Sequence, residues 1–450
     1  MAAASMIVDH TRVGAAFRRL SVPVAVQMLG DQLLGVVDTI AIGSLGTVAL
    51  AGATAATTIF MAIAFAALGF MSGTSIVAAQ RIGARDIEGF ARTVRAGFVG
   101  PVAVGVVSFL VSLVAASAAV RALVGPLPSA HASALYLILR CASILPVVVS
   151  GTLITGLAAA GNRRFGVWVL LVVNVVHLPL LAMLALGWVT HHPFGIAGAG
   201  VSSLLSETIA AIYAIVYVAR RPQYRIFSEL TLSWRLAWRC VRLGSPEAVF
   251  LLGVMAPDIF IVAMLAPLGA IAVAAFRALN VVSDLTFVVP SPLQSAAQIV
   301  IGQRLGARDA MGAQWFFQRA TRVSLLLTTL TGIVTALLAW PLAYLFTLDA
   351  AVATIAAWPL AVHMITLPLK GWAMLSLAPI RASGDTRFSM VLGIVCSALV
   401  IPLAYIGIER LHLGLYSVAL GWIVAWGVRA AVTQWKLHDG AWMRRAPLAA

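Results

Sequence analysis

Long apolar stretches separated by short polar segments dominate the chain. Each stretch reaches about 20 residues, the length that a helix needs to cross the hydrocarbon core of a bilayer. The stretches lack strict alternation, and a helix satisfies its own backbone hydrogen bonds in lipid, so we expect helices rather than strands. The pattern predicts twelve spans, over residues 21–44, 54–77, 97–120, 132–156, 167–189, 197–219, 244–265, 272–301, 321–346, 355–378, 389–408 and 415–435.

The composition favours a membrane protein and excludes other classes. Of the 450 residues, 62% are hydrophobic and 10% are charged, whereas a soluble domain has about 45–50% apolar and about 25% charged residues. The small polar fraction also excludes intrinsic disorder. The net charge of +15 is spread over short clusters rather than one basic tail, which argues against a nucleic-acid partner. We therefore predict an all-α polytopic membrane protein whose surroundings are membrane lipid.

Basic residues are concentrated in alternate connecting segments. The segments on the opposite side hold only Arg121 and Arg410. Because positively charged loops remain in the cytoplasm, we expect both termini there, in a bacterial-type inner membrane. The segment before the first span lacks an apolar core followed by a cleavage site, so no cleaved signal peptide is predicted.

An internal repeat relates the two halves of the chain at a constant offset of 223 in the numbering. Residues 80–86 are QRIGARD and residues 303–309 are QRLGARD, and the same offset relates Pro23 to Pro246. Each half then holds six spans, and an even number gives both halves the same orientation. Parallel repeats of this kind occur in secondary transporters, whose substrate site lies between two lobes. The predicted fold is therefore two parallel six-helix lobes.

The longest polar stretch separates the two halves. It contains Pro222, two tryptophans and six arginines, and it is typical of a partly amphipathic cytoplasmic linker at the membrane interface. The predicted organisation is a cytoplasmic N-terminal segment, an N-lobe, a linker, a C-lobe and a cytoplasmic tail, over residues 1–20, 21–219, 220–243, 244–435 and 436–450.

Motifs of enzyme chemistry are missing from the sequence. It contains no HExxH, GxxxxGK[ST], GxSxG or strand-linked GxGxxG pattern. Cys141, Cys240 and Cys396 are single thiols without CxxC spacing, which argues against a disulfide framework and a zinc site. We therefore predict no enzyme activity, no metal centre and no cofactor, and any transport must use an ion gradient or a separate protein.

Acidic residues within the predicted spans are the main candidates for function. Inserting a charged side chain at the bilayer centre costs about 2.5–3.5 kcal/mol of free energy, so such a residue is expected to have a functional or structural role. A buried carboxyl group can exchange a proton for a cationic substrate. The acids within spans are Asp31, Asp38, Glu207, Glu247, Asp258 and Asp284.

Several motifs resemble those of the multidrug and toxin extrusion (MATE) family of cation-coupled exporters, over essentially the whole chain. Residues 37–43 (VDTIAIG) resemble its Val-Asp-Thr motif, the two QRxGARD loops resemble its Gly-Gln-x-x-Gly-Ala loops, and residues 381–386 (RASGDT) resemble its Arg-Gly-x-x-Asp-Thr stretch. The pattern of Tyr136 and Arg140 resembles that of the DinF-like branch of this family. The resemblance implies a monomeric exporter of organic cations and other xenobiotics, driven by protons or sodium ions.

The resemblance also implies a coupling site in the N-lobe. The family uses a helix-1 Asp, a helix-5 Asn and a helix-6 Thr, which match Asp38, Asn174 and Ser203. Many relatives carry a second Asp four residues after the Asn, where this chain has Leu178 beside His177.

Two other acids are candidates for the missing carboxylate. Asp31 lies seven residues before Asp38, about two helical turns away and on the same face. Glu207 lies in the sixth predicted span. Each of these acids is equally compatible with a protonated residue that packs between helices.

In the second lobe, Asp258, Asp284 and Lys370 are candidates for lining the substrate cavity. Lys370 stands eleven residues before Arg381, where NorM-like relatives place an Asp used for sodium. A fixed positive charge repels sodium, so we prefer protons as the coupling ion. We expect Lys370 to pair with Asp258 or Asp284, and a structural pair and a coupling role both remain open.

The remaining charged and titratable residues in the spans have ordinary explanations. Arg140 and Arg277 are expected to reach the lipid headgroups from the outer ends of their helices. His177 and His363 could titrate near neutral pH, but hydrogen-bonded packing is the expected role for both.

The sequence therefore predicts an ion-gradient-driven antiporter of organic cations or other amphipathic small molecules, with alternating access between two lobes. One alternative is a lipid-linked oligosaccharide flippase of the same superfamily, which would line its cavity with Arg and Lys. A second alternative is a non-transporting membrane receptor. A receptor would need soluble sensor regions, whereas the longest polar stretch is the short linker.

Overall fold

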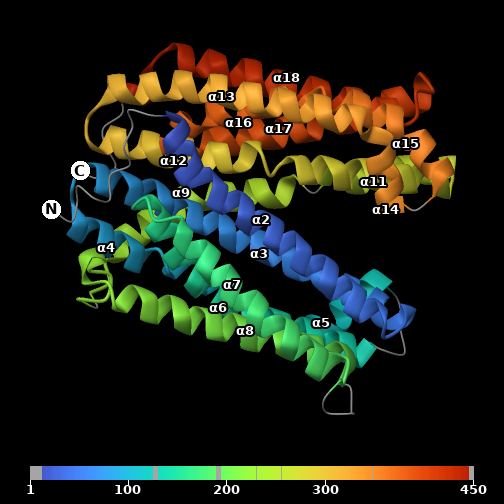
Figure 1. The fold of residues 1–450 in the computed structure, drawn as a ribbon, viewed down its shortest axis with the longest axis horizontal. Helices are drawn as coiled ribbons and strands as arrows, with labels where there is room; N and C mark the ends of the chain where they lie inside the picture. Colours follow the sequence, from blue (N-terminus) through green and yellow to red (C-terminus); the bar gives the residue numbers. More distant parts are fainter. Residues whose placement is uncertain are drawn as a thin grey trace. The chain divides into compact units, whose positions relative to one another are not determined.

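A computed structural model describes residues 13–124, 130–188, 194–229, 231–254, 256–347 and 349–444. Across these ranges the regular secondary structure is helical, without a strand (Figure 1). The helices are α2 (Val13–Gly43), α3 (Thr47–Gly83), α4 (Ile87–Ala96), α5 (Val99–Val124), α6 (Ala130–Ala159), α7 (Arg164–Leu180), the π-helix η1 (Leu181–Ala185), α8 (Gly195–Ala219), the 3-10 helix η2 (Pro222–Tyr224), α9 (Trp234–Gly253), α10 (Ala256–Leu265), η3 (Ala266–Leu268), α11 (Ala270–Thr286), α12 (Pro290–Gly306), α13 (Ala310–Leu337), α14 (Ala339–Thr347), α15 (Ala350–His363), α16 (Thr366–Ala382), α17 (Thr386–Tyr405), the π-helix η4 (Ile406–Arg410), α18 (Leu415–His438) and α19 (Ala441–Arg444).

The chain forms two compact units. In the described residues, unit 1 is Val26–Ala248, and unit 2 is the chain from Val249 onward together with the start of α2 up to Ala25. Helices α2 and α9 therefore contribute to both units. In unit 1, α6 packs against α3, α5 and α8, and in unit 2, α16 packs against α12, α13 and α18.

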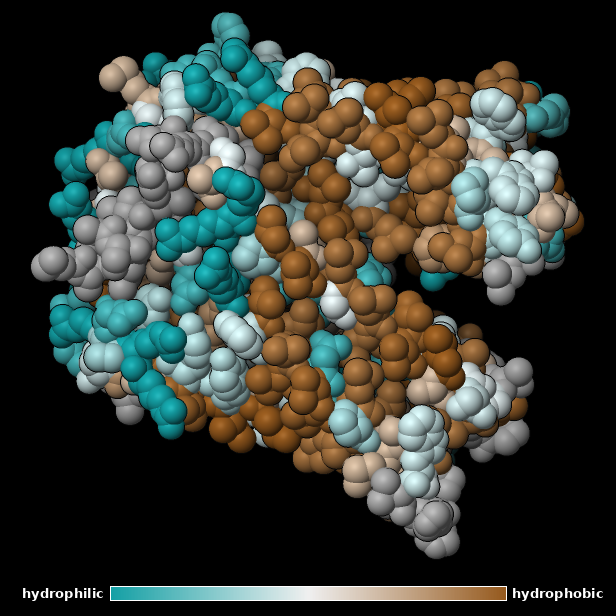
Figure 2. Space-filling model, in the orientation of Figure 1, coloured by the Kyte–Doolittle hydropathy of each residue, from teal (hydrophilic) through white to brown (hydrophobic). Residues whose placement is uncertain are grey.

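Eleven helical segments of the described residues are long and apolar enough to cross a membrane. A further segment is broken, because α15 and α16 pass the same test together but meet at 43° between His363 and Thr366. Counting this bent pair as one span gives the predicted twelve. Figure 2 shows apolar side chains over the flanks of the helices and hydrophilic side chains at their ends, as expected for helices surrounded by lipid.

Small residues let helices of unit 1 approach closely. A Cβ atom on Gly73 of α3 would overlap the carbonyl oxygen of Cys240 on α9. A Cβ atom on Gly244 would lie 2.6 Å from the carbonyl oxygen of Phe70. Only glycine fits at these crossings, which agrees with the role of small residues between membrane helices.

The backbone repeats at the offset found in the sequence. Gly46 precedes α3 with φ of 111°, and Gly269 precedes α11 with φ of 100°. Arg85 and Arg308 both have φ of 59° in the turns of the two QRxGARD loops. Positive φ is uncommon outside glycine, so its recurrence at two arginines related by the repeat shows that both halves build the same turn.

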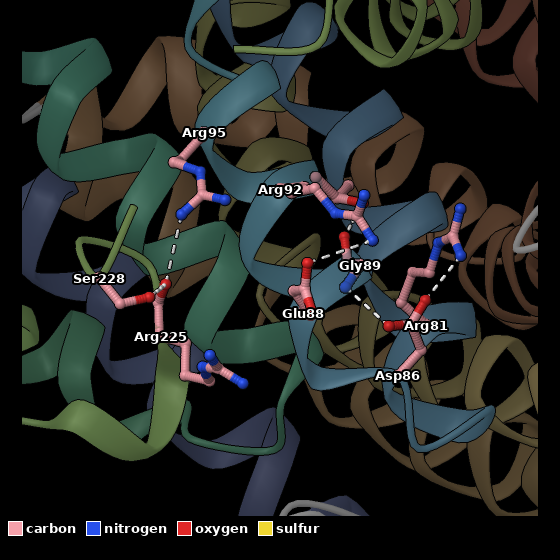
Figure 3. A network of polar contacts seen from close by, with 9 residues as sticks. Arg81, Asp86, Glu88, Gly89, Arg92, Arg95, Arg225 and Ser228 are labelled. Atoms are coloured by element: carbon pink, nitrogen blue, oxygen red, sulfur yellow. Dashed lines mark hydrogen bonds and ion pairs between the residues drawn. The ribbon is translucent and has the colours of Figure 1, made fainter. Parts of the chain in front are cut away.

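The same loops also share their helix caps. The Asp86 carboxylate accepts a hydrogen bond from the Gly89 N–H at 2.7 Å and pairs with Arg81 at 2.6 Å (Figure 3). Asp309 repeats the cap at 2.8 Å and the ion pair at 2.5 Å in unit 2. These contacts satisfy backbone donors at the starts of α4 and α13. The loops therefore have a structural explanation.

The polar segment after α8 is anchored to unit 1. Arg95 of α4 donates a hydrogen bond to the carbonyl oxygen of Ile226 at 3.1 Å, and Figure 3 shows the guanidinium of Arg95 directed at this segment. Tyr224 and Ile226 are buried in the core of the unit. The predicted linker limits of 220–243 remain a prediction.

Candidate functional site

Asp38 of α2 contacts a histidine rather than the predicted asparagine and serine. His177 Nε2 on α7 lies 2.8 Å from Asp38 Oδ1, and His177 Nδ1 lies 3.3 Å from Ser206 Oγ on α8. The side chain of His177 is 3% exposed and that of Asp38 is 23% exposed. Three helices thus build a chain of carboxylate, imidazole and hydroxyl groups inside unit 1.

Two arrangements of hydrogen atoms fit this chain. In the first, His177 Nδ1–H donates to Ser206, Ser206 donates to the Ser203 carbonyl oxygen at 3.0 Å, and one proton lies between Nε2 and Asp38. In the second, Ser206 donates to Nδ1, and Nε2–H donates to the Asp38 carboxylate. The two arrangements differ by one proton. The site can therefore gain or lose a proton while the contacts of His177 with Asp38 and Ser206 are kept, and only the bond from Ser206 to the Ser203 carbonyl oxygen is given up.

Close packing of α8 against η1 brings the hydroxyl group to the ring. A Cβ atom on Gly198 of α8 would overlap the carbonyl oxygen of Leu184 in η1. Pro179, two residues after His177, removes a backbone donor from the end of α7, and the chain continues as η1. His177 thus lies where a regular helix ends, one residue before the Leu178 position at which many relatives carry an Asp.

The other two predicted coupling residues bond to their own helices. Asn174 Nδ2 donates to the Leu170 carbonyl oxygen at 2.9 Å, and Ser203 Oγ donates to the Ala199 carbonyl oxygen at 3.1 Å. Among the contacts of the described residues, neither side chain reaches Asp38. Their role in coupling therefore remains a prediction.

Glu207 and Asp31 lie near the same site. Glu207 on α8 is within electrostatic reach of Asp31, Arg140 and His177. Arg140, expected at the headgroups, instead places its guanidinium 3.7 Å from the centre of the Phe60 ring. Unit 1 thus gathers three carboxylates, an arginine and a histidine from four helices.

A second buried polar chain lies in unit 2. Lys370 of α16 is 2% exposed, and its Nζ donates to Ser283 Oγ on α11 at 2.9 Å. Ser283 Oγ lies 3.0 Å from His363 Nε2 on α15. The ammonium group also lies 4.6 Å from the centre of the Phe287 ring.

The direct ion pair predicted for Lys370 is replaced by a hydrogen bond. In the described part of the chain no carboxylate is in ion-pair contact with Lys370 Nζ. Asp284 attracts it from longer range, because the neighbouring Ser283 occupies the contact position. Asp258 accepts a hydrogen bond from Asn280 and is repelled by Asp284. The two acids therefore lie close together near the exposed Arg277, without touching the lysine.

The polar chains of the two units are built from carboxylate, imidazole, hydroxyl and amine groups. Within the described ranges no group of three or more His, Cys, Asp or Glu side chains is placed to hold a metal ion. Cys141, Cys240 and Cys396 are buried free thiols.

Comparison with known proteins finds likenesses along both halves of the chain. The sequence profile of the MatE family matches residues 23–183 and 248–406. Probable multidrug resistance protein NorM of Rhizobium meliloti is 29% identical over 308 residues, which cover 66% of this chain and 65% of that protein. Multidrug resistance protein NorM of Burkholderia vietnamiensis is 25% identical, with 93% of this chain and 92% of that protein covered. The solved structure of a MOP superfamily transporter from Pyrococcus furiosus, at 22% identity, covers 98% of both chains with a TM-score of 0.89 and shares the fold.

Proposed function

The chain belongs to the MatE family of multi-pass membrane transporters, which are not enzymes, and we propose that it exports amphipathic organic cations in exchange for protons. Relatives named multidrug resistance proteins support the substrate class. The observation that supports the proton is the contact of 2.8 Å between Asp38 and His177. The resemblance to this family further supports a protein that acts as a monomer in the inner membrane.

The proton changes the charge of this pair. With one proton fewer, a neutral His177 faces the ionised Asp38, and the pair carries one negative charge that attracts a cationic substrate. With the proton bound, the pair is neutral overall and the attraction is lost. Proton binding from outside therefore favours release of the cation. Proton binding shifts the equilibrium between the two states of the transporter. The size of the shift cannot exceed the difference between the affinities of the two states for the proton.

Sodium suits this site less well than a proton. A hard cation is held by several oxygen ligands. Here the nearest group to Asp38 is an imidazole nitrogen, and Ser203 and Asn174 hydrogen-bond to their own helices. An imidazole nitrogen beside a carboxylate can instead share a proton with it.

The experiment is dye transport in proteoliposomes, with a proton gradient and a sodium gradient imposed separately. A lipophilic cationic dye is the substrate, and Asp38→Asn is compared with the native protein. We expect the proton gradient to drive the dye, and the variant to lower the rate by about tenfold or more, because hydrogen bonds to charged groups contribute about 1.5–3 kcal/mol.

Glu88→Gln is the matched control, since it also neutralises a carboxylate but lies in an exposed pair with Arg92 at 3.6 Å. Sodium-driven movement would overturn the choice of ion and keep the exporter. If neither gradient moves the dye while a fluorescent lipid is flipped, the oligosaccharide flippase replaces this proposal.

A further inference from the structure

Lys370 is a buried amine that contacts no carboxylate of the described residues. Burying an unpaired charge is costly, so each of its neighbours matters. The hydrogen bond to Ser283 and the ring of Phe287 at 4.6 Å supply part of the stabilisation, and the ring of Trp426 lies at 5.9 Å. An aromatic face attracts the ammonium group but does not carry the full negative charge that a carboxylate would supply.

Ser283 connects Lys370 to His363, whose second ring nitrogen has no hydrogen-bond partner among the described residues. Ser283 Oγ lies between Lys370 Nζ at 2.9 Å and His363 Nε2 at 3.0 Å. His363 Nδ1 is buried and has no hydrogen-bond partner. A buried polar atom left unpaired in a native fold calls for an explanation, and a part in proton transfer is one.

The single hydrogen of the Ser283 hydroxyl group sets which groups donate and which accept between Lys370 and His363. When Lys370 is charged, Nζ donates to Ser283, Ser283 donates to His363 Nε2, and the histidine carries its hydrogen on Nδ1. When Lys370 is neutral, His363 Nε2–H donates to Ser283, and Ser283 donates to the lone pair on Nζ. The unpaired Nδ1 then bears a lone pair. The two arrangements differ by one proton and by the tautomer of His363.

We propose that His363, Ser283 and Lys370 form a proton path in unit 2, with His363 Nδ1 as the entry and Lys370 Nζ as the group that holds the proton. A proton from the gradient binds Nδ1, the Nε2 hydrogen passes to Ser283 Oγ, and the original hydroxyl hydrogen passes to Nζ. Three bonds to hydrogen form and two break, so one proton is taken up and the positive charge ends on Lys370.

Asp284 favours a positive charge on Lys370, and the other charged groups around the path lie beyond contact with Nζ. From α11, Asp284 attracts Lys370, and Arg277 lies in the field of the same aspartate. From α18, Arg429 lies 4.9 Å from the ring centre of Trp426, which also faces Lys370. His363 is the titratable group from α15. The attraction of Asp284 for Lys370 favours the proton at the lysine end.

This inference rests on the proposed proton coupling, to which it adds a second proton site. Its test does not depend on transport. The full-length protein, labelled with ¹⁵N-histidine in liposomes, is studied by solid-state NMR over a pH series. The eight histidines are resolved by subtracting the spectrum of His363→Gln. We expect His363 to change from the Nε2–H to the Nδ1–H tautomer as the pH falls, without becoming doubly protonated.

Two variants remove the path in different ways. Lys370→Met and Ser283→Ala should each abolish the tautomer change, while Ser383→Ala, a buried serine bonded to the Ile380 carbonyl oxygen of the preceding helix, should leave it intact. If Lys370→Met does not fold, Ser283→Ala carries the test. A single tautomer at every pH, or an imidazolium at His363, would overturn the path whatever the outcome of dye transport.

Discussion

Unit 1 and unit 2 build the same backbone around different polar centres. Phe60 and Arg140 of unit 1 correspond, at the offset of 223, to Ser283 and His363 of unit 2. In unit 1 the guanidinium lies 3.7 Å from the ring centre, and in unit 2 the hydroxyl lies 3.0 Å from the imidazole. Equivalent helices, α3 with α6 and α11 with α15, bring both pairs together. The repeat therefore preserves a contact between positions but not its chemistry.

The carboxylate that we propose for coupling has an apolar residue at the equivalent position of unit 2. Asp38 corresponds to Ile261, which is fully buried in an apolar cluster of unit 2. His177 corresponds to Val400, a member of the same cluster. A duplicated fold can thus hold an acid-based proton site in one copy and an amine-based site in the other, because the backbone leaves the polarity of each position free.

The two buried histidines give the largest expected difference between the units. His177→Gln removes the ring that bonds Asp38, so we expect dye transport to fall by about tenfold or more. His363→Gln keeps the Asp38 site, so transport should continue with one proton fewer per dye, measured with a pH-sensitive fluorophore inside the vesicles. Equal losses in both variants would contradict this division of roles.

Matched glycines test how far the packing of the units differs. Gly198 and Gly421 are equivalent positions of the repeat. An alanine Cβ would overlap the Leu184 carbonyl oxygen in unit 1, but would meet the nearest atom of Val400 at 3.4 Å in unit 2. Overpacking costs about 1–3 kcal/mol, so Gly198→Ala should lower the thermal midpoint in detergent and Gly421→Ala should leave it nearly unchanged. A larger effect at Gly421 would reverse the assignment of the tight crossing.

The smallest difference is expected at the duplicated caps. Asp86→Ala and Asp309→Ala should each lower the free energy of unfolding by about 1 kcal/mol, since the carboxylates accept equivalent backbone hydrogen bonds at 2.7 and 2.8 Å. Asp→Asn at either position should retain most of the cap. Thermal unfolding of the four variants measures this, and a loss confined to one loop would show that the shared turn is not equally stabilised.

Hydropathy and self-similarity alone determined the spans and the repeat. A helix in lipid must be long and apolar, so its position can be predicted from a run of consecutive apolar residues. The offset of 223 likewise needs no knowledge of packing, and it makes Arg85 and Arg308 equivalent positions, where the structure has matching turns. The acidic character of the first unit's site could also be predicted, because Asp38 is an intramembrane charge.

The contacts of the two polar chains were decided by tertiary structure. The sequence pattern indicated positions 178 and 284, whereas the contacts are made by their neighbours His177 and Ser283. Adjacent residues of a helix point about 100° apart, and the residue that faces another helix depends on how the two helices pack. Polar side chains such as Asn174 also bond to their own helix. The sequence thus determines which helices carry the chemistry, and packing selects the residue that performs it.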